Sequence, residues 1–320
     1  MIGDHVRKPR DGGAAGASIA AMNIASLIRL PVHQPFDWAV IAGFLGPRCI
    51  PGVEAVDGLV YRRSILLDGR HGTIELGPDE DGALGVAIRY PDPAAHAGIV
   101  ARLVRQFDLM TDIAAIGVQF GRDPLLAPLV ARRPGLRVPG AWDPFELAVR
   151  AILGQQVSVA GATTLAGRLA LAYGAPLRLE DGMPPPPGLF QVFPDPAALV
   201  AADPGVLRIP TKRAQTIAGL ARAALAEPAL LAGGLPLGEL VARLDALPGI
   251  GPWTAHYIAM RALREPDAFP SGDLGLRKAM ITEAGLPSFK EMDLRAEAWR
   301  PWRAYAALHL WMSLGGGTGG

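Results

Sequence analysis

Three kinds of chemical group follow one another between Leu247 and Asp273. Pro248–Gly251 is a glycine-rich turn, and glycine permits the tight backbone conformations that other residues rarely adopt. The amides at the start of the following helix would point at an anion such as a phosphate without needing a lysine. Trp253 and Tyr257 are four residues apart and so share one helix face, which forms a stacking surface for a flat ring. A phosphate cradle, a stacking surface and the lone carboxylate of Asp273 are the parts needed to excise a damaged base from DNA.

Each of these features also has a simpler explanation. Pro-Gly turns commonly join two helices, and aromatic pairs on a helix commonly lie in a core. Asp273 precedes an apolar helical stretch, so it is also expected to be a helix N-cap. The two roles of Asp273 are compatible, because a capping carboxylate is held rigidly. A non-catalytic DNA-binding module would keep the turn but has no use for Asp273 beside the aromatic residues.

Composition restricts how the chain can bind DNA or metals. The formal net charge of the 320 residues is +1, so any contact with nucleic acid must be local. Cys49 is the only cysteine, which excludes an internal disulfide and a cysteine-ligated zinc or iron–sulfur site. The six histidines show no metal-ligand spacing.

The first part of the chain, residues 30–112, is expected to form a small α+β domain. Phe36–Arg48 and Ala94–Met110 have helical spacing of their apolar residues. Three strands are expected between them, separated by turn formers such as Asp68-Gly69 and Asp81-Gly82. Their sequences are GLVYRRSILLD, HGTIELGP and ALGVAIRY.

From about residue 113 onward the chain is expected to be almost entirely helical. Residues 113–137 with 266–314 are expected to form one helical subdomain, and 138–265 a second that carries the glycine turn. The stretch from Asp143 to Gly174 has an N-cap, a proline at its first helical position and a glycine stop. Asp195 and Thr211 are expected to cap two further helices.

The ends of the chain have a different character. Residues 1–29 are expected to be a disordered leader, with Met22 as a candidate native start, and residues 315–320 a flexible tail. No stretch is apolar enough to span a membrane.

Several separated motifs in the same order give a resemblance to a known family. The chain resembles the helix-hairpin-helix base-excision DNA glycosylases, and within them it is similar to the DNA-3-methyladenine glycosylase II family. The similarity runs from Leu30 to Ser313. It is carried by the glycine turn with Asp273 and by FDWAVIAGFLGPR, RPGLRVPGAWDPFELAVRAILGQQVSVA and WRPWRAYAALHLW.

The resemblance implies an α+β fold: a mostly helical glycosylase core preceded by a TATA-binding-protein-like antiparallel sheet. It implies that Asp273 is the catalytic aspartate. It also implies a base pocket, a hairpin that grips a phosphate, and a wedge beside the extruded base. The implied pocket residues are Trp253, Tyr257, Trp311 and Phe44; those of the hairpin are Gly249, Gly251 and Thr254; those of the wedge region are Gln155 and Gln156.

The resemblance further implies a monomer that excises alkylated purines from double-stranded DNA in the bacterial cytoplasm, near the nucleoid. Backbone carbonyls of Leu247 and Ile250 are expected to hold a structural sodium or potassium ion, with no other cofactor required. Bifunctional relatives carry a nucleophilic lysine where this chain has Trp253, so no lyase step is expected. Hypoxanthine, uracil and oxidised purines remain open as alternative substrates. The well-known wedge is apolar, whereas Gln156 is polar.

Overall fold

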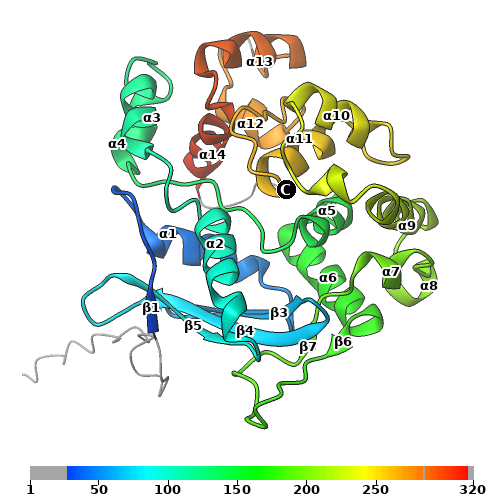
Figure 1. The fold of residues 1–320 in the computed structure, drawn as a ribbon. Helices are drawn as coiled ribbons and strands as arrows, with labels where there is room; N and C mark the ends of the chain where they lie inside the picture. The colour runs from blue at the N-terminus through cyan, green and yellow to red at the C-terminus, as the bar shows by residue number, and fades with distance from the viewer. Residues whose placement is uncertain (1–26, 284, 316–320) are drawn as a thin grey trace, which may run out of the picture.

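A five-stranded antiparallel sheet supports an arc of helices in the computed structural model, which describes residues 27–283 and 285–315 (Figure 1). The strand order is β1-β5-β4-β3-β2. The strands are β1 (Leu27–Arg29), β2 (Glu54–Asp57), β3 (Val60–Leu67), β4 (Arg70–Pro78) and β5 (Leu84–Arg89).

The three strands expected from the sequence are confirmed as β3, β4 and β5. Asp68 and Gly69 both have positive φ, which is the geometry of a tight hairpin turn between two strands. The edge strands β1 and β2 were not foreseen, because they have only 3 and 4 residues and no readable alternation. Strand β1 also shows that residues 27–29, which were expected in the leader, belong to the sheet. The rest of that leader lies outside the described residues.

Two helices cover one face of the sheet, α1 (Trp38–Leu45) and α2 (His96–Gln106) (Figure 1). They correspond to the two helices expected in this domain, each shortened at its ends. Trp38 and Tyr61 pack edge-on against Phe107, at ring-centroid distances of 5.2 and 5.7 Å. This apolar layer gives the sheet domain its own core.

The remaining helices form two packed groups. One group contains α3 (Ile113–Phe120), α4 (Ala127–Arg132), α12 (Leu274–Ala279), α13 (Phe289–Ala296) and α14 (Arg303–Ser313). The other contains α5 (Pro144–Leu153), α6 (Val159–Tyr173), α7 (Pro196–Leu199), α8 (Pro204–Leu207), α9 (Thr211–Ala226), α10 (Leu237–Asp245) and α11 (Pro252–Arg261). A two-stranded ribbon, β6 (Ala175–Pro176) with β7 (Gln191–Val192), follows α6. Short 3₁₀ turns follow α1 and α9 and precede α2 and α14.

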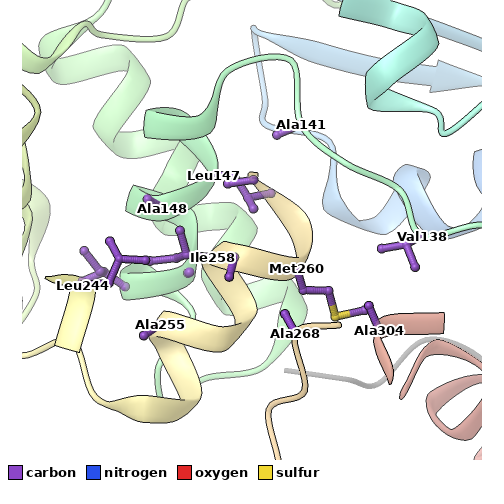
Figure 2. Packing of buried hydrophobic residues seen from close by; sticks show 14 of the residues in the cluster. Val138, Ala141, Leu147, Ala148, Leu244, Ala255, Ile258, Met260, Ala268 and Ala304 are labelled. Atoms are coloured by element: carbon purple, nitrogen blue, oxygen red, sulfur yellow. The ribbon is translucent and has the colours of Figure 1, made fainter. Parts of the chain in front are cut away.

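Helix α11 packs against both groups, because most of its surface is apolar. Figure 2 shows Ile258 among Ala148 of α5 and Leu244 of α10, with Met260 extending toward Ala304 of α14. Ile258 and Met260 are at most 1% exposed. Burying such side chains stabilises the fold by about 1.5–3 kcal/mol each.

Two expectations about the helices are wrong in detail. The stretch from Asp143 to Gly174 is not continuous: it breaks into α5 and α6 at residues 154–158, where Gln156 adopts a φ of 59° and Ser158 caps the second helix. Thr211 is not an N-cap but the first residue of α9, because Pro210 precedes the helix and offers no capping side chain. The caps at Asp143, Asp195 and Asp273 are confirmed.

A buried network of charges joins the sheet to α5. Arg63 on β3 donates to Glu146 on α5 at 2.7 Å, and Arg150 on α5 donates to Glu54 on β2 at 3.0 Å. Despite its burial, the pKa of Glu54 is held below its usual value by Arg150 and Arg63. Removing one partner of such a network would leave an uncompensated buried charge, at about 3–5 kcal/mol.

No helix among the described residues is both long enough and apolar enough to cross a membrane. Gly315 is the last described residue, so the expected tail 315–320 lies almost wholly outside the described residues.

His309 on α14 predicts an acid-dependent loss of stability. Burial lowers the pKa of His309 from 6.5 to about 4. Below pH 6.5 the unfolded chain binds a proton that the folded chain refuses, so the free energy of unfolding falls as the pH drops from 6.5 toward 4, by about 1 kcal/mol per pH unit. His309→Gln should flatten that part of the curve. Urea unfolding at several pH values measures it, and an unchanged slope would contradict the assignment.

Candidate active site

The carboxylate of Asp273 is held by three hydrogen bonds from three helices. As N-cap of α12, its Oδ1 accepts from the amide of Leu276 at 2.8 Å. The indole of Trp311 on α14 donates to Oδ1 at 2.8 Å, and the indole of Trp253 on α11 donates to Oδ2 at 3.1 Å. Asp273 is 7% exposed, and the three donors satisfy both of its buried oxygens. The expected capping and catalytic positions therefore coincide in one rigid carboxylate.

The expected aromatic residues surround this carboxylate. Trp253 and Tyr257 stack, with ring centroids 5.3 Å apart and planes inclined by 15°. Tyr257 and Trp311 lie 6.4 Å apart and are tilted by 59°. Trp311 comes from the far end of the sequence, and the packing of α12 on α14 brings it next to Asp273. The three rings thus form one aromatic wall beside the acid.

Phe44 lies near this wall, but arginines cover it. The guanidinium groups of Arg48 and Arg261 lie over the Phe44 ring, 3.9 and 4.8 Å from its centroid. Arg261 also donates to the hydroxyl of Tyr257 at 3.0 Å. Phe44 is therefore a support for the arginines rather than an open stacking surface.

A pocket opens between the aromatic wall and the junction of α5 with α6. It contains about 620 Å³ of empty space, part of which is open to solvent. Its lining includes Trp253, Tyr257, Arg48, Arg150 and Arg261. The pocket therefore combines a stacking surface with guanidinium groups.

The arginines give the pocket a positive character. Burial, together with the neighbouring charges of Arg261 and Arg150, lowers the pKa of Arg48 to about 10. Burial also lowers the pKa of Arg261, which is 5% exposed. All three remain mainly protonated at neutral pH and can act only as donors. They would face acceptor atoms of a bound molecule.

The glycine turn joins α10 to α11 as a helix-hairpin-helix. Gly249 has a φ of 90°, whereas Gly251 has an extended backbone with a φ of −95°. Of the two glycines, only Gly249 therefore uses the positive φ that glycine permits. A Cβ atom on Gly249 would lie 1.9 Å from Oγ1 of Thr216 on α9, while one on Gly251 would meet no atom within 4 Å. Gly249 is needed for packing, and Gly251 leaves an open approach to the start of α11.

The other expected DNA-contacting residues divide into inward and outward groups. Thr254 is 3% exposed, and its hydroxyl accepts from Gln155 at 3.1 Å, so it supports the hairpin from inside. Gln155 also donates to the carbonyl of Gly249 at 3.0 Å. Of these three residues, only Gln156 is exposed.

The residues expected to hold a cation are part of the same hairpin. The carbonyl of Leu247 accepts from the amide of Ile250 at 3.0 Å, which leaves the oxygen a second lone pair. Ile250 is 3% exposed. Among residues 27–283 and 285–315, no group of three or more His, Cys, Asp or Glu could hold a metal ion.

Sequence reasoning missed the three arginines of the pocket. Arg261 is four residues after Tyr257, and this spacing places both on one helix face. Arg150 and Arg48 interrupt stretches that are otherwise mainly apolar. A charged residue within an apolar stretch was the signal that could have identified these arginines.

The chain is similar to proteins of known class. The profile of the AlkA N-terminal domain family matches residues 27–143. The DNA-3-methyladenine glycosylase 2 of Escherichia coli K12 is 36% identical over 291 residues, which cover 88% of this chain and 96% of that protein. The probable bifunctional transcriptional activator/DNA repair enzyme AlkA of Mycobacterium tuberculosis H37Rv is 40% identical over 288 residues. This match covers 90% of the chain but only 57% of the mycobacterial protein.

The fold is also found in solved structures. The 3-methyladenine DNA glycosylase of Archaeoglobus fulgidus superposes with a TM-score of 0.76. The superposition covers 90% of this chain and 97% of that chain, at 23% identity. The expected fold class, a helical core preceded by an antiparallel sheet, is confirmed.

Alanine substitutions of the two hairpin glycines are expected to differ in their effect on stability. Gly249→Ala places a methyl group against Thr216 in a backbone conformation that alanine avoids, so we expect a loss of about 2–4 kcal/mol. Gly251→Ala, the matched control, meets no neighbour and should change stability by less than about 0.5 kcal/mol. Chemical denaturation of both variants measures the difference. Equal stabilities would contradict the packing role of Gly249.

Proposed function

Because this chain belongs to the AlkA family of DNA-3-methyladenine glycosylases, we propose that it flips alkylated purines out of double-stranded DNA and excises them by hydrolysis. The relevant lesions are 3-methyladenine, 7-methylguanine and related bases. The protein would act as a monomer in base excision repair, in the bacterial nucleoid.

The observation that carries the proposal is the buried carboxylate of Asp273 beside a wall of three aromatic rings. The indole donors Trp253 and Trp311 both belong to that wall, so the acid and the stacking surface form one unit. A base stacked on the wall would place its sugar near the carboxylate. A purely structural N-cap would not need two further indole donors.

The chemistry of alkylated purines suits this arrangement. Alkylation at N3 or N7 gives the purine ring a positive charge, which an aromatic wall attracts by about 0.5–2 kcal/mol. The same charge makes the base a good leaving group, so little acid catalysis is needed. Asp273 would then stabilise the oxocarbenium-like sugar and orient or deprotonate the attacking water.

Access to the glycosidic bond requires the nucleotide to leave the base stack. The amides at the start of α11, next to Gly251, would bind a backbone phosphate. Gln156, at the exposed tip of residues 154–158, would fill the space that the extruded base leaves and hydrogen-bond the orphaned partner. Both surfaces are close together, since Gln155 bridges them.

We propose a monofunctional enzyme without lyase activity. A lyase step requires an amine nucleophile beside the sugar. The aromatic ring of Trp253 occupies the position where bifunctional relatives have that lysine. A sodium or potassium ion at the carbonyls of Leu247 and Ile250 is also proposed; it would add positive charge where the hairpin approaches a phosphate.

The pocket arginines favour a second class of substrate for the same enzyme. Donors from Arg48, Arg150 and Arg261 suit a neutral base that presents carbonyl acceptors, such as hypoxanthine. They do not attract a cationic ring. Release of hypoxanthine from an inosine-containing duplex tests this second class directly.

Release of 3-methyladenine and 7-methylguanine from methylated duplex DNA tests the main proposal. Wild-type protein should release both bases, and Asp273→Asn should lower the rate at least about 100-fold, because the carboxylate charge is lost. The variant should still bind a duplex that contains an abasic site. Turnover by Asp273→Asn at the wild-type rate would overturn the catalytic role.

Trp311→Phe tests whether the indole donor matters beyond its ring. Phenylalanine keeps an aromatic ring but removes the N–H that Asp273 accepts, and we expect kcat to fall about tenfold or more. Trp302→Phe is the matched control, since Trp302 packs edge-on against Tyr305 and is not among the three donors to Asp273. Single-turnover base release measures both variants. Equal rates would show that the hydrogen bond to Trp311 is dispensable.

A further inference from the structure

Residues 154–158, here called the wedge turn, adopt a conformation that their own sequence does not favour. Gln156 lies in the left-handed region with a φ of 59°, although it is not a glycine. This conformation persists in a folded protein only when surrounding contacts hold it. The contacts that hold the wedge turn come from elements distant in the sequence.

The first contact ties the wedge turn to the hairpin. The side-chain amide of Gln155 donates to the Gly249 carbonyl at 3.0 Å and to the Thr254 hydroxyl at 3.1 Å. The amide therefore spans the turn of the hairpin and the first turn of α11. Gln155 is engaged within the protein, and its neighbour Gln156 is left to reach outward.

The second contact ties the same turn to α9. Arg213 donates to the backbone carbonyl of Gln155 at 2.6 Å. Thr216, three residues along α9, lies against Gly249 so closely that no Cβ atom fits there. Residues three apart share a helix face. One strip of α9 therefore supports both the wedge turn and the hairpin.

We propose that Gln155 and Arg213 are positioning residues that couple the phosphate grip of the hairpin to insertion of Gln156 into the DNA. This inference rests on the proposed function, because it explains how the proposed phosphate grip and the proposed wedge are held in fixed positions relative to each other. A phosphate bound at the hairpin then fixes where Gln156 enters the base stack. Arg213 lies in the first turn of α9 and is engaged by the wedge turn.

The test separates DNA binding from wedge insertion in Gln155→Leu. Leucine has a similar size but lacks both donors. The probe is a duplex with a tetrahydrofuran abasic analogue opposite 2-aminopurine, whose fluorescence rises when the inserted wedge unstacks it. Anisotropy of the same duplex gives the affinity, and 7-methylguanine release gives kcat and KM.

We expect the affinity of Gln155→Leu to change by less than about threefold, because phosphate contacts dominate affinity. The 2-aminopurine fluorescence at saturation should fall well below the wild-type value. The kcat should fall on the order of tenfold with KM little changed, as for a misplaced group in the transition state. Arg213→Met should show the same pattern.

Two controls isolate the coupling. Gln119→Leu is the matched control, since its amide donates to a single backbone carbonyl, that of Arg300, away from the site; it should leave every readout unchanged. Gln156→Ala removes the wedge itself. If Gln155 acts through Gln156, the double variant should be no worse than Gln156→Ala.

The outcomes distinguish this inference from the proposed function. If the wild-type protein releases 7-methylguanine and Gln155→Leu keeps full fluorescence and full kcat, the positioning role is overturned and the proposed function stands. Additive losses in the double variant would overturn it as well. Absence of both base release and fluorescence rise in the wild type would overturn the proposed function, and this inference with it.

Discussion

The carboxylate of Asp273 is only 7% exposed, so its oxygens need donors that the fold supplies, and this requirement links three helices around it. The amide of Leu276 comes with the start of α12, and the two indoles come from α11 and α14. A shift of any of these helices would leave a buried carboxylate oxygen short of a donor. The burial of α11 against both helical groups keeps this arrangement fixed, and the pocket and aromatic wall are built around it.

Helix α9 has a comparable role for the surface that would meet DNA. Its Thr216 sets the path of the hairpin at Gly249, and its Arg213 holds the wedge turn through the carbonyl of Gln155. The parts that contact DNA are thus supported by a helix that need not touch it. The sheet domain is joined to α5, which lines the pocket, by the hydrogen bond from Arg63 to Glu146.

Local patterns predicted much of this protein. The strands with clear turn formers, the caps at Asp143 and Asp273, and the pairing of Trp253 with Tyr257 depend on residues close in sequence, and the structure has all of them. The break at residues 154–158 was not predicted, because it depends on Arg213 and Gly249, which lie far along the chain from that turn.

The sequence by itself determined the type of the longer elements and the identity of the groups that could do chemistry: one carboxylate, a set of aromatic rings and a glycine turn. It also determined that no cysteine cluster takes part, because only Cys49 is present. Tertiary structure alone decided which donors reach Asp273, that arginines cover Phe44, and that Gln155 turns inward while Gln156 turns outward. The physical reason is that helix and turn preferences act over a few residues, whereas hydrogen bonds and packing between distant helices depend on how the whole core is filled.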